Sequence, residues 1–78
     1  EVHLTPTEFD LLRVLAVNAG KVLTHRQILE RVWGDYAAEN ARQLRVYINY
    51  LRRKLEADPT SPQIILTEPG VGYRLRVP

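Results

Sequence analysis

The sequence contains no cysteine, so it can form neither a disulfide framework nor a thiolate metal site. No apolar run approaches the roughly 18 residues that a transmembrane helix needs, and no signal peptide is visible. The absence of cysteine fits a reducing compartment, and we expect a cytoplasmic location. Because the chain begins with Glu1 and not with methionine, we expect a piece of a longer protein whose targeting signals lie elsewhere.

Groups that support catalysis are also scarce. His3 and His25 are the only histidines, and neither is accompanied by a carboxylate pair or a nucleophile. The glycines at 70 and 72 are too sparse for a phosphate-binding loop. We therefore expect no enzymatic activity, no metal site and no cofactor.

Positive charge, by contrast, is concentrated in residues 41–56. This stretch carries five basic residues and one acidic residue, a net charge of +4, whereas the whole chain has a net charge of +2. When the stretch is wound as a helix, one side is apolar and the opposite side is basic and polar. The apolar side holds Leu44, Ile48, Leu51 and Leu55, and the other side holds Arg42, Val46, Asn49, Tyr50 and Arg53, flanked by Arg45 and Arg52. This pattern is typical of a DNA-recognition helix, but an ordinary surface helix with solvated arginines would also show it.

Two further helices are predicted before this one. Thr5 to Glu8 has the residues of a capping box with proline at the first helical position, and this helix ends before Gly20. Thr24 and Gln27 suggest a second capping box, for a helix from about residue 25 to residue 33. The residues expected to face the core are Phe9, Leu11, Leu12, Leu15 and Ala16 in the first helix, and Ile28, Leu29, Val32 and Trp33 in the second.

Strands are predicted near both ends of the chain. Residues 1–4 alternate, and because an isolated strand buries nothing, they fit the last strand of a sheet that begins upstream. Residues 63–67 are β-branched and apolar, residues 73–77 alternate, and the two glycines between them favour a turn, which together predict a β-hairpin.

The order of elements is strand, helix, short extended link, helix, loop, helix and hairpin. It predicts an α+β winged helix-turn-helix domain with three helices and a C-terminal hairpin wing. In this layout the third helix, at about 41–57, enters the major groove, whose width suits a helix. The wing, at 63–77, contacts the flanking backbone or the minor groove.

Four segments carry a more specific resemblance. They are LTPTEFDLL at 4–12, GKVLTHRQILERVWG at 20–34, LRVYINYLRRKLE at 44–56 and TEPGVGYRL at 67–75. Together they resemble the effector domain of the OmpR/PhoB family of two-component response regulators over nearly the whole chain. TEPGVGYRL and LRVYI are most similar to the subgroup that controls the potassium-uptake (Kdp) operon.

The resemblance has implications for the whole protein. It implies an upstream receiver domain phosphorylated by a sensor kinase, and an N-terminal sheet of four strands, of which residues 1–4 would be the last. Residues 1–78 would then be a trimmed effector domain. The resemblance also implies dimers on tandem DNA half-sites and contact with RNA polymerase through the loop at 34–40.

The third helix carries one candidate phosphate contact and three candidate base contacts. The resemblance makes Arg42, at the start of this helix, a phosphate contact. Val46 either touches a thymine methyl group or is a tolerated surface residue, and Asn49 either reads adenine or binds phosphate. Tyr50 stands where some relatives place a base-reading arginine, so stacking, a phosphate hydrogen bond and plain packing are all open.

Candidate backbone contacts surround these positions. Arg45, Arg52 and Arg53 are expected to contact phosphates, with one of them idle in solvent, and Lys54 is expected on the solvated flank. Arg26 can join the positive end of the second helix to hold a phosphate.

The remaining candidates lie at the end of the second helix and in the wing. Trp33 packs in the core, aims its indole N–H at a phosphate, or does both. Thr67 and Tyr73 donate hydrogen bonds to oxygens of the DNA backbone, unless Tyr73 packs inward. Pro69 stands where many relatives carry an arginine that enters the minor groove. We therefore expect this wing to read the minor groove more weakly than the wings of those relatives do. Arg74 would compensate for the lost contact by binding the DNA backbone.

Two other classes of binding module remain open. A winged helix can serve as a protein-interaction module that applies its basic helix to an acidic partner. RNA binding fits less well, because the major groove of A-form RNA is too narrow for a helix.

Overall fold

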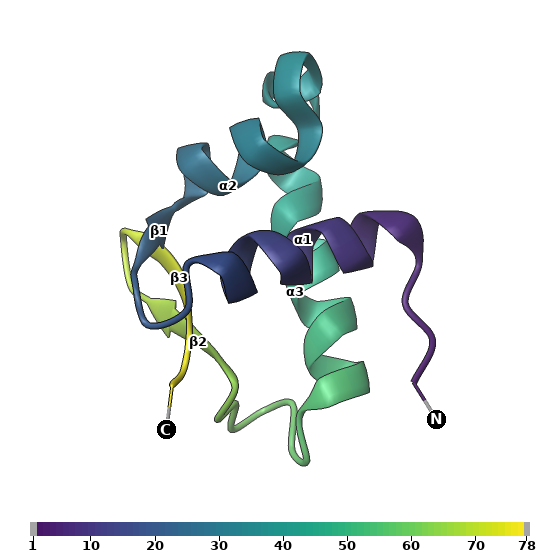
Figure 1. Cartoon of the computed structure of the whole chain (residues 1–78), viewed down its shortest axis with the longest axis vertical. Coiled ribbons are helices and arrows are strands. Elements are labelled where there is room, and N and C mark those ends of the chain that lie inside the picture. Colours follow the sequence, from purple (N-terminus) through teal and green to yellow (C-terminus); the bar gives the residue numbers. More distant parts are fainter. Residues whose placement is uncertain (1, 78) are drawn as a thin grey trace.

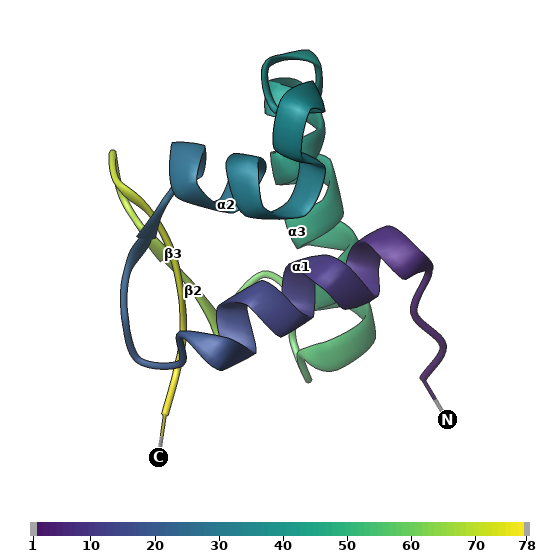
Figure 2. The ribbon, with the colours of Figure 1, turned by 45° about the horizontal axis from the view of Figure 1, so that its top comes forward.

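Three helices pack around one core, and a small sheet closes one side of it (Figure 1). The computed structural model describes residues 2–77. Within that range the order is α1 (Pro6–Val17), β1 (Leu23–Thr24), α2 (His25–Trp33), the 3-10 turns η1 (Gly34–Tyr36) and η2 (Ala38–Asn40), α3 (Ala41–Leu55), β2 (Ile65–Glu68) and β3 (Gly72–Leu75). This confirms the predicted winged helix-turn-helix. A view from another side shows the hairpin of β2 and β3 standing beside α2 (Figure 2).

The first two helices begin as predicted. Thr5 Oγ1 accepts from the Glu8 N–H at 3.3 Å, and the Glu8 carboxylate accepts from the Thr5 N–H at 2.9 Å. Thr24 and Gln27 make the same reciprocal pair at 3.0 and 2.9 Å. Each box satisfies two backbone donors that a helix start otherwise leaves unpaired.

The sheet contains a strand that the sequence did not predict. The expected extended link before α2 includes β1, which pairs antiparallel with β3 so that Leu23 faces Tyr73. The strand order is β1-β3-β2. Gly72 makes this pairing possible, because a Cβ at that position would collide with the Leu23 carbonyl oxygen. The wing is thereby joined to the start of α2.

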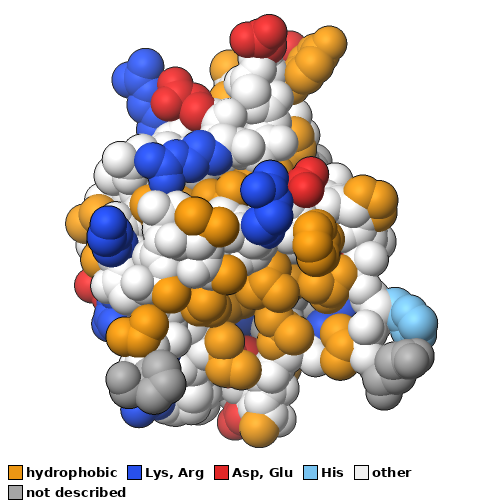
Figure 3. Space-filling view, in the orientation of Figure 1, with side chains coloured by type: hydrophobic (Ala, Val, Ile, Leu, Met, Phe, Trp, Pro, Cys, Tyr) orange, Lys and Arg blue, Asp and Glu red, His pale blue; other side chains and the backbone are white. Residues whose placement is uncertain are grey.

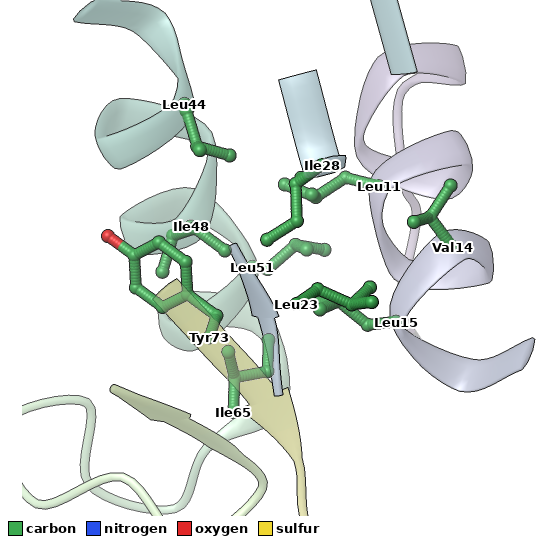
Figure 4. Close-up of a cluster of buried hydrophobic side chains, with 10 residues drawn as sticks. All are labelled: Leu11, Val14, Leu15, Leu23, Ile28, Leu44, Ile48, Leu51, Ile65 and Tyr73. Carbon is green, nitrogen blue, oxygen red and sulfur yellow. The ribbon is translucent and has the colours of Figure 1, made fainter. Parts of the chain in front are cut away.

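The core draws on every helix and strand. Its fully buried members include Leu11, Leu15, Ile28, Ile48 and Ile65 (Figure 4).

Two core predictions on α1 are wrong. Phe9 is 56% exposed and Ala16 is also exposed, whereas Val14 is buried in their place. At 100° per residue, Phe9 and Ala16 share a side of α1 that differs from the side of Leu11. The face of the molecule that carries α1 accordingly shows apolar side chains across its middle (Figure 3).

The chain ends depart from prediction. Val2–Leu4 form no strand, and Glu1 lies outside the described residues. A strand needs a partner, and the N-terminal segment lies on the opposite side of the molecule from the sheet (Figure 1). Helix α3 ends at Leu55, two residues before the predicted end, because Glu56 is already extended (φ −84°, ψ 142°). Val77 lies beyond β3 and is exposed.

Candidate nucleic-acid interface

Helix α3 has the two sides that its sequence predicts. The apolar stripe is buried at Leu44, Ile48 and Leu51. The residues predicted to point outward are all exposed: Arg42, Val46, Asn49, Tyr50 and Arg53. Half of the helix is thus anchored in the core, and the other half presents arginine, amide, aliphatic and phenol groups to solvent.

A groove runs between α3, the N-terminus of α2 and the wing. It has a volume of about 540 Å³, and we call it the α3–wing groove. Its walls bring together predicted contacts from separate elements: Arg45, Asn49, Arg52, Thr67 and Tyr73. His25 and Glu68 also line it, and neither was predicted as a contact.

The side chain of Arg52 lies on this groove but is turned toward β2. Its Nε and Nη2 donate to the Ile65 carbonyl at 3.2 and 2.8 Å, and Nη2 also donates to Thr67 Oγ1 at 2.8 Å. Its guanidinium carbon lies 5.8 Å from the centre of the Tyr73 ring. The side chain predicted to reach a phosphate is therefore occupied within the protein.

Tyr73 packs inward, which was one of the two arrangements predicted for it. It is 7% exposed, yet its hydroxyl points away from the other core side chains (Figure 4). The His25 ring meets the Tyr73 ring edge-on at 5.4 Å, and the His25 backbone N–H donates to the Val71 carbonyl at 3.2 Å. The first residue of α2 thus contacts the wing directly, through a backbone contact that no sequence pattern indicates.

Trp33 belongs to a row of three aromatic rings on the other flank of α3. It is half-buried and lies 5.8 Å from the Tyr47 ring, which lies 5.6 Å from the Tyr50 ring. The predicted packing of Trp33 is confirmed. Tyr50 is held on one side by Tyr47, which the sequence did not single out.

Two other basic residues form ion pairs. Arg26, near the N-terminus of α2, is highly exposed and lies 3.4 Å from Glu30. Lys54 is exposed, as predicted, but it also forms an ion pair that was not predicted: its Nζ lies 2.5 Å from the Glu8 carboxylate and donates to the His3 carbonyl at 3.0 Å. Burial alone would raise the pKa of Glu8, but hydrogen bonds from Lys54 and Thr5 together hold that pKa below its ordinary value.

Glu56 is an anchor that sequence reasoning missed. Its buried carboxylate accepts from the backbone N–H groups of Gln63, Ile64 and Ile65 at 2.8–3.0 Å. Burial opposes ionisation, but these three donors outweigh it and lower the pKa of Glu56. The carboxylate fixes the chain where it enters β2. An acidic residue at the end of a basic helix gives no sign of this role.

The wing tip is a tight turn. The Val71 N–H donates to the Glu68 carbonyl at 3.0 Å, and Gly70 has the positive φ (74°) that suits the position after proline in such a turn. Arg74 lies 3.3 Å from the Glu68 carboxylate, so it pairs across the hairpin. Pro69 at the tip is exposed and contributes neither charge nor donor.

Within residues 2–77, no helix combines the length and hydropathy that crossing a membrane requires.

Comparisons with known proteins are consistent with this geometry. Residues 1–75 match the family described as "Transcriptional regulatory protein, C terminal". The chain is 60% identical over 74 residues to the KDP operon transcriptional regulatory protein KdpE of Escherichia coli, covering 95% of this chain and 33% of that protein. It therefore spans about a third of the length of this curated relative.

Solved structures show the same fold. The DNA-binding domain of Klebsiella pneumoniae RstA, in complex with the RstA box, superposes with a TM-score of 0.85 at 32% identity, covering 96% of this chain and 74% of that one. The response regulator DrrB of Thermotoga maritima, described as an OmpR/PhoB homologue, superposes with a TM-score of 0.84 at 38% identity, covering 97% of this chain and 34% of that one.

Proposed function

The chain belongs to the family of transcriptional regulatory C-terminal domains, the winged-helix effector domains of OmpR/PhoB response regulators, and from this premise we propose that it binds double-stranded DNA at specific sequences. Helix α3 enters the major groove, and the wing reaches the flanking backbone or the minor groove. The observation that carries the proposal is the exposed basic side of α3 beside a groove that the wing completes.

Affinity and specificity come from different residues. Neutralisation of phosphates supplies most of the affinity, and contacts to base edges supply the specificity. Asn49 has the amide that reads adenine, and Val46 offers an aliphatic surface to a thymine methyl group. The residues assigned to the DNA backbone are Arg26, Trp33, Arg42, Arg45, Arg53, Thr67 and Tyr73. Tyr50 is assigned to the interface without a choice between a base and a phosphate contact.

The rest of the proposal concerns the whole protein. The similarity to KdpE supports regulation of a potassium-uptake operon. We infer a longer, non-enzymatic regulator in the cytoplasm, with a receiver domain on which a sensor kinase acts, and dimers on tandem half-sites. The segment at 34–40, with Asp35, Tyr36 and Glu39 exposed, is the surface proposed for RNA polymerase.

A salt-dependent binding titration tests the DNA proposal. The chain is titrated against a tandem-half-site promoter fragment of a potassium-uptake operon and a scrambled duplex at several salt concentrations. We expect tighter binding to the promoter fragment. Arg42→Ala should weaken binding to both duplexes and reduce the slope of log K against log salt by about 0.9, the loss of one phosphate contact.

The control is Arg13→Ala, which removes an exposed arginine from α1 and should leave the slope unchanged. Equal binding of both duplexes, with no effect of Arg42→Ala, would refute sequence-specific binding through α3 and would favour a protein partner.

A further inference from the structure

Two side chains at the end of α3 hold one residue of the wing, Ile65, through both of its backbone polar groups. The Ile64 carbonyl accepts from the Arg76 N–H of the neighbouring strand segment at 2.8 Å, so the backbone groups of Ile65 point away from β3. The Ile65 N–H donates to Glu56 at 2.8 Å, and its carbonyl accepts from Arg52. Arg52 lies in the last turn of α3 and Glu56 directly follows the helix, so the end of α3 holds the start of β2 through these two side chains.

The guanidinium of Arg52 contacts β2 at a second residue as well. One side chain reaches both the Ile65 carbonyl and Thr67 Oγ1, and it lies over the Tyr73 ring of β3. Arginine suits this position because its planar fork carries several donors in fixed directions, whereas the ammonium of lysine is a compact point charge.

We propose that Arg52 is a positioning residue that fixes the wing against α3 and so sets the shape of the α3–wing groove. The proposal rests on the DNA-binding function above, because α3 and the wing must fit one duplex at the same time. A wing that is already fixed before DNA binds loses less conformational freedom on binding than a mobile wing would. Arg52 also orients Thr67: its Oγ1 accepts from Arg52, which leaves the hydroxyl hydrogen to donate to a phosphate.

A positioning role and a phosphate contact predict different effects of lysine. A phosphate contact survives Arg52→Lys, because lysine also binds phosphate as a point charge. A clamp that uses two donors of one guanidinium does not survive it. Since both residues carry one positive charge, the salt slope should not change in either case.

Two measurements test the proposal on the 78-residue chain and its Arg52→Lys, Thr67→Val and double variants. The first is the affinity for a duplex that the wild-type chain selects from a randomised pool, and for a scrambled duplex. The second is amide hydrogen exchange of the DNA-free chain at Ile65 and Arg76, with Leu51 as a core reference. Arg13→Lys on α1 is the matched control.

We expect Arg52→Lys to weaken binding to the selected duplex about tenfold, equivalent to about 1.4 kcal/mol, with an unchanged salt slope. Exchange at Ile65 and Arg76 should be about tenfold faster by the same conversion, whereas Leu51 and the Arg13→Lys control should match wild type. The double variant should lose less than the sum of the two single losses, because both act on one contact.

Wild-type exchange rates in Arg52→Lys would overturn the proposal, whatever the DNA affinity does. Faster exchange with wild-type affinity would show that the clamp does not serve DNA binding, which also overturns it. A wild-type chain that selects no sequence would instead refute the function on which the proposal rests.

Discussion

Replacement of Glu56 by glutamine tests how the wing is attached to the helical core. Glu56 is 8% exposed, and its carboxylate accepts from three consecutive backbone N–H groups at the entrance to β2. Glutamine keeps the length of the side chain but replaces one acceptor oxygen with an NH2 group, which faces a backbone donor. At least one buried N–H then loses its partner, and the remaining bonds lose their charge.

The size of the effect follows from these contacts. A hydrogen bond to a charged group contributes about 1.5–3 kcal/mol, and the cost of burying the carboxylate offsets part of the total. We expect Glu56→Gln to lower the free energy of unfolding by about 2–4 kcal/mol. A domain of this size has about 4–12 kcal/mol in all, so the midpoint of thermal unfolding should fall by roughly 10–25 °C.

The assay is urea and thermal unfolding followed by circular dichroism. Glu39→Gln, which replaces an exposed carboxylate in η2, is the control and should change stability by less than about 0.5 kcal/mol. Acid provides a second check. The pKa of Glu56 lies below its ordinary value of 4.5, so its stabilising effect is complete above pH 4.5 and is lost as the pH falls through the lowered value.

The difference in stability between wild type and Glu56→Gln should therefore be constant near neutral pH and shrink in acid. A variant within about 0.5 kcal/mol of wild type at pH 7, or a difference that does not change with pH, would refute the assignment of Glu56 as a charged anchor.

Three further substitutions test other parts of the fold. Gly72→Ala forces a Cβ into the Leu23 carbonyl, so it should lower the free energy of unfolding in urea by about 1–3 kcal/mol; unchanged stability would contradict the close approach of β1 and β3. Ile48→Ala removes a fully buried side chain and should cost about 2–5 kcal/mol in the same assay; a loss below that range would argue against its place in the core. Lys54→Met leaves Glu8 buried without its cation, which should cost about 1–2 kcal/mol and raise the pKa of Glu8 in an NMR titration; an unchanged pKa would contradict the ion pair.

Local patterns predicted the helices well. Both capping boxes, the stripe on α3 and the glycine turn of the wing use contacts between residues two to four apart, so the sequence alone reveals them. The side of α1 that faces the core was harder. Phe9 looks like a core residue, but the phase of the helix is set by Leu11 and Leu15, which face the other elements.

The contacts that shape the candidate site span longer distances. Arg52 meets Ile65 thirteen residues later, and Lys54 meets Glu8 forty-six residues earlier. Neither partnership leaves a pattern in a single sequence, because an arginine that faces solvent and one that faces a strand look the same there. The exposed side of α3 was predictable, whereas the contact of Arg52 with the wing was not.

The contacts of Arg52 and Glu56 with Ile65 also affect self-association. In the order β1-β3-β2, β2 is an edge strand, and unpaired groups on an edge can recruit a strand from another molecule. Arg52 and Glu56 occupy the outward N–H and carbonyl of Ile65, so the first residue of this edge is closed to such pairing. A chain that lost either side chain would expose an apolar strand edge, and its tendency to form intermolecular sheets would rise with concentration. The same two contacts that attach the wing therefore also close part of this strand edge to pairing with a second molecule.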